Sequence, residues 1–150
     1  MADIQTRFFD FTRGADMALE GLLLAEDDEL ATAIIISLFT DAQARPDDAI
    51  PHNGTDRRGW WADVFADASG DAIGSRLWLL FPGKQVRENL VKARQFAEEA
   101  LAWLVADEIA QRVVVEATNP RDGILALAVS VHKPDGSRLA YRFDSLWGAA

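Results

Sequence analysis

The chain has 150 residues and no cysteine, and its 24 acidic residues outnumber its 15 basic ones to give a formal net charge of −9. This length suits one domain with one core, and the lack of cysteine excludes disulfides and thiolate metal sites. A negative surface repels phosphate backbones and anionic lipids, so neither nucleic acid nor a membrane is an expected partner. The first 14 residues lack the apolar core of a signal peptide, and the longest apolar run is too short to span a bilayer. We therefore expect a soluble protein that is assembled in the cytoplasm.

Residues 1 to 20 are mixed and weakly periodic. Together with Gly14, Gly21 and scattered aspartates, this predicts an irregular arm over residues 1 to 27, with a short element at Met17 to Leu24. The periodic patterns begin at residue 28. We therefore expect residues 28 to 150 to form a single domain that follows this arm.

A helix is predicted at residues 28 to 40, because Leu30, Ile34 and Leu38 are four residues apart and line one face. The acidic run Asp27-Asp28-Glu29 suits the positive N-terminal end of such a helix. The isoleucines would also suit a strand. The acidic residues and the length of the segment favour the helix.

A long polar segment follows at residues 41 to 74, with prolines, glycines and no clear period. A loop of this length inside a compact domain is usually functional or held by specific contacts. The next segment, 84 to 106, is the clearest helix, because apolar residues recur at steps of three and four along one face. These residues are Val86, Leu90, Ala93, Ala97, Leu101 and Leu104.

The pattern then changes to a period of two, which is typical of strands. The run at 112 to 118 is rich in residues that favour strands, and the runs at 125 to 131 and 139 to 143 alternate large apolar residues with smaller or polar ones. A turn sequence, Lys133-Pro134-Asp135-Gly136, separates the last two runs. Helices come first, strands follow, and no βαβ alternation occurs. The predicted class is α+β: an N-terminal helix and long loop, then one long central helix packed on a C-terminal antiparallel β-meander.

Patterns that would carry catalysis or bind a metal are weak in this sequence. The two histidines, His52 and His132, are far apart and lack the spacing of metal ligands. Neighbouring carboxylates such as Asp47 and Asp48 could act as an acid–base pair, but acidic runs are usually solvated faces. No segment follows the spacing of a calcium loop, and no serine has the context of a nucleophile. We expect no catalytic residue, no metal and no cofactor.

The densest group of chemically versatile residues lies in the long loop, in DRRGWWAD (56 to 63) and GDAIGSRLWLLF (70 to 81). Stacking of single-stranded nucleic acid on its aromatic residues is one interpretation, which the net charge and the neighbouring acids oppose. A second is a network of Arg–Asp pairs that ties the loop to the core, with the tryptophans as packing anchors. A third is a protein interface. The residues concerned are Arg57, Arg58, Trp60, Trp61, Arg76 and Trp78.

If the network forms, we expect Arg57, Arg58 and Arg76 to pair with carboxylates of the same loop region. The density of opposite charges in a segment without periodic structure motivates this expectation. The candidate partners are Asp56, Asp63 and Asp71, or Asp47 and Asp48.

Several stretches resemble the Mu-type phage tail baseplate proteins named for gene product 46. Together these stretches cover roughly residues 28 to 147, and the combination of DRRGWW with GSRLWLL is specific because so many Trp and Arg residues rarely coincide. The order of GSRL, long helix and strands is also distantly similar to the T4-type sheath-initiator family, gene product 25. The matching stretches are LATAIIISLFTDAQARPDDAIP (30 to 51), DRRGWWAD, GDAIGSRLWLL, EEALAWLVADEIAQRVVVEA (98 to 117) and PDGSRLAYRFDSLW.

The resemblance implies a structural protein, not an enzyme, in the baseplate of a contractile tail. Such a protein would be present in several copies in the virion. It would join other wedge proteins near the tail tube and offer a sheet edge to the first sheath ring. Its partners would then be wedge proteins, the tail sheath and possibly the tail tube.

The meander itself agrees with this implication, because it leaves an edge strand that can accept a strand from another chain. Arg138, Tyr141 and Arg142 lie on its last strand. The two arginines would either fix the register against acids of a partner or serve as ordinary solubilising charges. The alternative function is a lysozyme-like tail enzyme that degrades peptidoglycan, and a further rival is a regulatory binding module of the host. An assay for clearing of peptidoglycan would test the enzyme. The identity of the neighbouring genes would test the regulatory module, because a baseplate gene lies beside spike and wedge genes.

Overall fold

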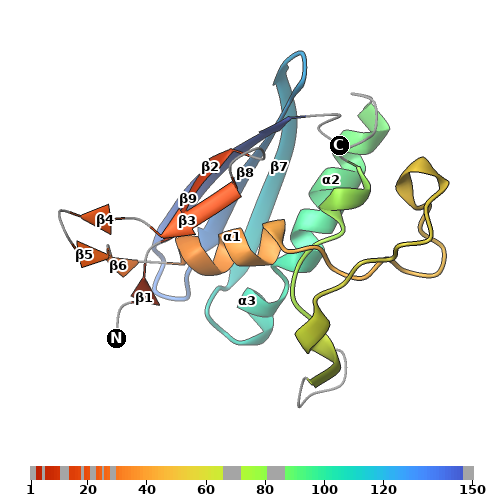
Figure 1. The fold of residues 1–150 in the computed structure, drawn as a ribbon. Coiled ribbons are helices and arrows are strands. Elements are labelled where there is room, and N and C mark those ends of the chain that lie inside the picture. The colour runs from red at the N-terminus through yellow and green to blue at the C-terminus, as the bar shows by residue number, and fades with distance from the viewer. Residues whose placement is uncertain are drawn as a thin grey trace.

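The fold consists of helices packed on one face of a three-stranded sheet (Figure 1). The computed structural model describes residues 30–65, 72–80 and 87–146, and the backbone of short strands between residues 3 and 27. This arrangement confirms the predicted α+β class. The main elements are α1 (Ala31–Phe39), α2 (Arg87–Ala100), α3 (Trp103–Ala106), β7 (Arg112–Arg121), β8 (Ile124–His132) and β9 (Arg138–Leu146).

The sheet is the predicted meander, with β7, β8 and β9 antiparallel and in sequence order. Val115, Val129 and Tyr141 occupy one cross-strand row and face the helices, while alternate residues face away. The turn between β8 and β9 is also the predicted one. The Gly136 amide donates to the Lys133 carbonyl at 3.1 Å, and Gly136 has a φ of +89°, which favours glycine.

Helix α1 confirms the helix expected at 28 to 40, but its start differs. The helix begins at Ala31, so its first turn contains no acidic residue. Asp27 belongs instead to the short strand β6 (Glu26–Asp27), and Asp28 and Glu29 lie outside the described residues. The first turn of α1 therefore holds no acid of its own, and the expectation for Asp28 and Glu29 concerns residues outside the described part of the chain.

The single helix expected at 84 to 106 is interrupted. Helix α2 ends at Ala100, and the chain resumes as the short helix α3 after a turn at Leu101 and Ala102. At the turn the backbone bonds tighten, since Ala102 donates to Glu99 and Leu104 donates to Leu101, both three residues earlier. Apolar spacing alone does not reveal the break, because Leu101 and Leu104 are both fully buried.

The described residues of the N-terminal segment form short paired strands, where we expected an irregular arm with a short element at Met17 to Leu24. These strands are mostly two residues long and show no readable alternation, which explains why the sequence pattern missed them. The described pairs are β1 (Asp3–Ile4) with β6, β2 (Thr6–Asp10) with β3 (Gly14–Met17), and β4 (Leu19–Glu20) with β5 (Leu23–Leu24). Strand β2 lies beside α1 and β9 without joining the main sheet (Figure 1).

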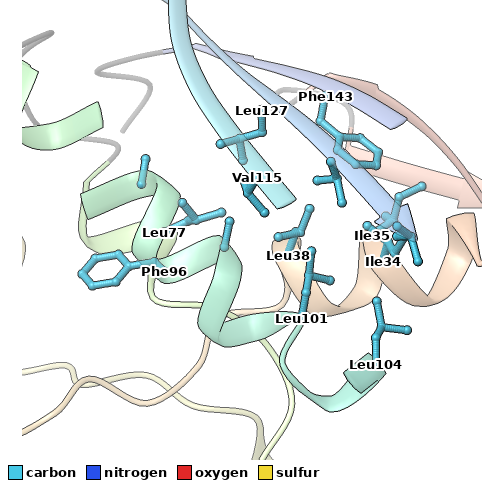
Figure 2. Close-up of a cluster of buried hydrophobic side chains, with 14 of the residues drawn as sticks. Ile34, Ile35, Leu38, Leu77, Phe96, Leu101, Leu104, Val115, Leu127 and Phe143 are labelled. Carbon is cyan, nitrogen blue, oxygen red and sulfur yellow. The ribbon is translucent and has the colours of Figure 1, made fainter. Parts of the chain in front are cut away.

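The core lies between the helices and the sheet, and Figure 2 shows side chains from both layers meeting there. Of the helix residues expected to face the sheet, Ala97, Leu101 and Leu104 are fully buried, and Leu90 is partly buried against the same cluster. Leu125, Leu127, Val129 and Val131 supply the buried face of β8. Helix-on-sheet packing is therefore confirmed.

Replacing Leu101 with alanine should lower the free energy of unfolding by roughly 2–5 kcal/mol, because it removes a fully buried side chain and leaves a cavity. Urea denaturation followed by circular dichroism measures this change. Val105→Ala is the matched control, since Val105 is 44% exposed and its loss should cost well under ~1 kcal/mol. Equal costs for the two variants would contradict the described packing.

Candidate functional site

The long loop leaves the end of α1 and returns to the same place. The Ala42 amide donates to the Ser75 carbonyl and the Ser75 amide donates to the Thr40 carbonyl, both at 2.9 Å. The Ser75 hydroxyl donates to the Leu38 carbonyl in the last turn of α1. Gly74 has a φ of +106°, and a Cβ there would lie 2.4 Å from the Thr40 carbonyl oxygen, so only glycine fits. The two ends of the loop are thus fixed to each other and to the helix.

Arg76, which follows Ser75, joins the loop to α2. Its Nη1 donates to both carboxylate oxygens of Asp48 at 2.8 and 2.9 Å, and its Nη2 donates to both oxygens of Glu99 at 3.0 and 2.8 Å. The guanidinium carbon lies 4.3 Å from the centre of the Phe96 ring. The Arg76 side chain is only 10% exposed. We call Arg76, Asp48 and Glu99 the arginine clamp, because one guanidinium binds both oxygens of two carboxylates, with one nitrogen for each.

The clamp shifts the ionisation of its members. Burial raises the pKa of Asp48. The hydrogen bonds from Arg76 and from the Arg45 amide lower the pKa by more than this, so the net shift is downward. Burial lowers the pKa of Arg76, and the hydrogen bonds with Glu99 and Asp48 more than offset this effect. Both groups therefore remain charged in the folded protein at neutral pH.

Arg58 and Trp78 form a second tie between the two halves of the loop. The Arg58 guanidinium lies 4.5 Å from the centre of the Trp78 ring and pairs with the Asp41 carboxylate. The indole Nε1 of Trp78 donates to the Ala42 carbonyl at 2.8 Å. Arg58 has a φ of +50°, an unfavourable value for a side-chain-bearing residue, and its amide is held by the Asp56 carboxylate at 2.8 Å. Trp78 is therefore a buried packing anchor.

The pairing partners expected for the arginines are partly confirmed. Arg76 pairs with Asp48 as expected. Arg58 binds Asp41 instead of the expected acids, and the Arg57 guanidinium donates to the Arg45 carbonyl at 2.7 Å. Two of the expected carboxylates, Asp56 and Asp63, accept backbone amides instead.

Asp56 accepts the Arg58 amide and Asp63 accepts the Ile73 amide at 3.1 Å, because aspartate readily binds nearby backbone N–H groups. Asp71 lies outside the described residues.

Sequence reasoning missed several members of this site. Glu99 was not expected to bind the loop, since its position on a helix gives no sign of a partner 23 residues away. Trp103 donates from Nε1 to the Ser37 hydroxyl at 3.0 Å, which in turn donates to the Ala33 carbonyl at 2.8 Å. A serine within an apolar run was the available signal, because a buried hydroxyl needs a partner.

The tip of the loop carries exposed apolar side chains. Val64 is 81% exposed, Phe65 is 74% exposed and Trp60 is 42% exposed. Val64 and Phe65 belong to a short 3-10 turn, Trp61–Phe65, which projects away from the sheet (Figure 1). For Trp61 the structure describes the backbone only.

The three candidate residues on β9 have different environments. Tyr141 faces the helices, and its hydroxyl accepts the Leu30 amide at 3.3 Å, so it ties the start of α1 to the sheet. Arg138 donates to the Ser130 hydroxyl at 3.0 Å, and Arg142 pairs with Asp144 at 3.1 Å; both arginines are exposed.

Among the described residues, no group of His, Asp and Glu is placed to hold a metal ion. The helices of the same part of the chain include none long and apolar enough to cross a membrane.

Replacing Asp48 with asparagine should lower the free energy of unfolding by about 2 kcal/mol at pH 7, because it removes the charge that Arg76 binds. The pKa of Asp48 is lower in the folded state, so its contribution is fully present above the unfolded value of about 4 and is lost as the pH falls through the folded value. The difference between the two proteins in urea unfolding should be constant from pH 7 to about 5 and shrink below about 4.

Glu98→Gln is the control for this experiment, because it removes an ion pair with Arg94 that lies on the surface. Its cost should stay below about 1 kcal/mol. A cost of Asp48→Asn that does not change down to pH 3 would contradict the ionic clamp.

Comparison with known proteins places these features in a family. The family described as Phage protein GP46 matches residues 30–138, a range that includes α1, the loop with its arginine clamp, and most of the sheet. The chain is 42% identical to the protein named baseplate protein gp46 of Escherichia phage Mu over 130 residues, covering 87% of this chain and 88% of that protein. It is 39% identical to the Mu-like prophage FluMu protein gp46 of Haemophilus influenzae over 147 residues, 98% of each chain. The chain belongs to the phage protein GP46 family.

Proposed function

We propose that this protein is a structural component of a phage tail baseplate and is part of the virion. The observation that carries this proposal is its similarity to the baseplate protein of Escherichia phage Mu over most of both chains. The family match spans the clamp, the loop and the helices beneath it, so the proposal concerns the domain described above.

The use of charge in the loop supports a structural role. Arg76 and Arg58 bind carboxylates that come from distant parts of the chain, and Arg57 binds a backbone carbonyl. Each of these contacts fixes the course of the loop. Such pairs add geometric specificity as well as energy, which suits a part that must present one shape to its neighbours.

The loop tip supports an interface with other baseplate proteins. Val64 and Phe65 are held out in solvent by a loop that is fixed at its base. An apolar side chain on a pre-organised loop loses little entropy on binding, and aromatic residues are enriched among the residues that dominate interfaces. We therefore place this tip against a neighbouring subunit of the baseplate.

More specifically, we propose a wedge-type protein that offers the edge of β9 to the first ring of the tail sheath. Lys133 donates to the Ser137 carbonyl at 2.9 Å, which fixes the hydrogen-bonded positions of the β8–β9 ladder. Bonded positions alternate along an antiparallel pair, so the amides of Arg138, Ala140 and Arg142 point away from β8. Such a row of outward amides can bind an added strand.

The N-terminal hairpin lies next to this edge. Strand β2 is beside β9 but pairs with β3, so the described strands give the outward amides of β9 no ladder partner. A strand from the sheath would therefore displace the hairpin from the edge. Strand β7 is the other outer strand and provides the alternative edge.

The experiment uses a phage whose own copy of this gene is deleted and supplies the protein from a plasmid. The unchanged protein should restore infectious particles with complete tails. Ala140→Pro should support baseplates without sheath, because proline removes one outward amide and leaves the β8 ladder intact. Electron microscopy of particles and their protein content provide the measurement.

Ala140→Ser is the matched control, since it keeps the amide and should restore sheathed tails. If the single variants with proline at position 138, 140 or 142 all assemble complete sheaths, the edge of β9 is not the sheath contact. Normal tails without any copy of the protein would overturn the baseplate role. Clearing of peptidoglycan by the purified protein would favour the lysozyme-like alternative.

A further inference from the structure

The face of the sheet that points away from the helices carries basic side chains in one cross-strand row. Arg112, His132 and Arg138 occupy directly opposed positions on β7, β8 and β9. Val131, which precedes His132 on β8, is fully buried in the core. Successive side chains of a strand point to opposite faces, so the row lies on the face away from the core. We call these three residues the basic row. Both of its arginines are exposed.

The arginines of the basic row have no carboxylate partner among the described residues. The Arg112 Nη2 atom lies 3.4 Å from the His132 ring nitrogen Nε2, and the Arg138 guanidinium donates to the Ser130 hydroxyl. The nearby Asp135 binds the Ser137 amide at 2.8 Å and the Ser137 hydroxyl at 2.6 Å. The chain has 24 acidic residues, and it supplies partners to Arg58, Arg76, Arg94 and Arg142.

This arrangement provides charge without compensation. Arg112 and Arg138 lie on either side of His132, so the row holds two guanidinium groups and no acid between them. A partner that brings carboxylates to the row would gain charge-assisted hydrogen bonds with both. The strands β7 and β9 are about 10 Å apart across β8, so two carboxylates fit the row better than one.

We propose that the basic row binds an acidic segment of another protein, through at least two of its carboxylates. The assignment rests on charge complementarity and does not depend on the baseplate role. Nucleic acid fits this face less well. Glu116 is exposed on the same face, two rows from the basic row, and would meet an extended phosphate backbone, while Arg142 on this face is already paired with Asp144.

The test measures binding of a fluorescent hexaglutamate peptide to the purified full chain by anisotropy, at about 20 mM salt where surface charges are weakly screened. The protein should bind the peptide, and added salt should weaken binding. Arg112→Gln/Arg138→Gln should reduce the affinity by about tenfold, because it removes both charge-assisted contacts. Arg112→Lys/Arg138→Lys should retain part of the affinity.

The matched control is Lys92→Gln/Arg94→Gln, which removes the same charge from the exposed surface of α2. Circular dichroism verifies that each variant is folded. An equal loss in both double glutamine variants would show that net charge alone drives binding and would overturn the proposal. No binding by the unchanged protein would also overturn it. Tighter binding of a single-stranded oligonucleotide, lost in the Arg112→Gln/Arg138→Gln variant, would assign the row to nucleic acid instead.

Discussion

The arginine clamp joins parts of the chain that no regular secondary structure connects. Arg76 follows the return of the loop, Asp48 belongs to its outgoing half, and Glu99 and Phe96 belong to α2. A guanidinium has enough donors to bind both carboxylates at once, whereas the single ammonium of lysine could not reproduce this flat, forked geometry. Both halves of the loop are therefore fixed against the helix that covers the sheet.

The clamp links the core to the surfaces that we assign to partners. Leu77 and Trp78 follow Arg76 directly and are buried, so the core holds the clamp in place. The clamp in turn fixes the loop that carries Val64 and Phe65 into solvent. Exposed apolar residues reduce solubility, and a chain retains them most readily where another protein covers them. The loop and the sheet would then serve different neighbours in one assembly.

Much of the architecture follows from patterns that local physics sets. The positions of α1, α2 and the three strands were predictable, because apolar residues repeat every three to four or every two positions. Gly136 marks its turn for a similar reason, since its positive φ favours glycine. Short strands such as β4 and β5 escaped prediction, because two residues cannot show a period.

The site was less predictable than the fold, for a physical reason. Charge density indicated that arginines of the loop would bind carboxylates, and Arg76 does bind Asp48. Arg76 binds Glu99 and not Glu98, because the rotation of α2 about its axis directs Glu99 toward the loop. Glu98 points elsewhere and pairs with Arg94, one turn earlier in the helix. Partners of this kind are set by tertiary packing, which a single sequence does not encode in a readable pattern.

Hydrogen exchange of the loop amides tests most directly whether the clamp holds the loop. The amides of Ala42, Ala44 and Ser75 are bonded to carbonyls of Ser75, Arg57 and Thr40, so they should be protected in the unchanged protein. In Arg76→Ala the exchange of these three amides should speed up by about tenfold or more. The amides of β8 exchange through global unfolding, so their rates should change only as much as the global stability does. Unchanged protection of the three amides in Arg76→Ala would contradict the clamp as the constraint on which the loop depends.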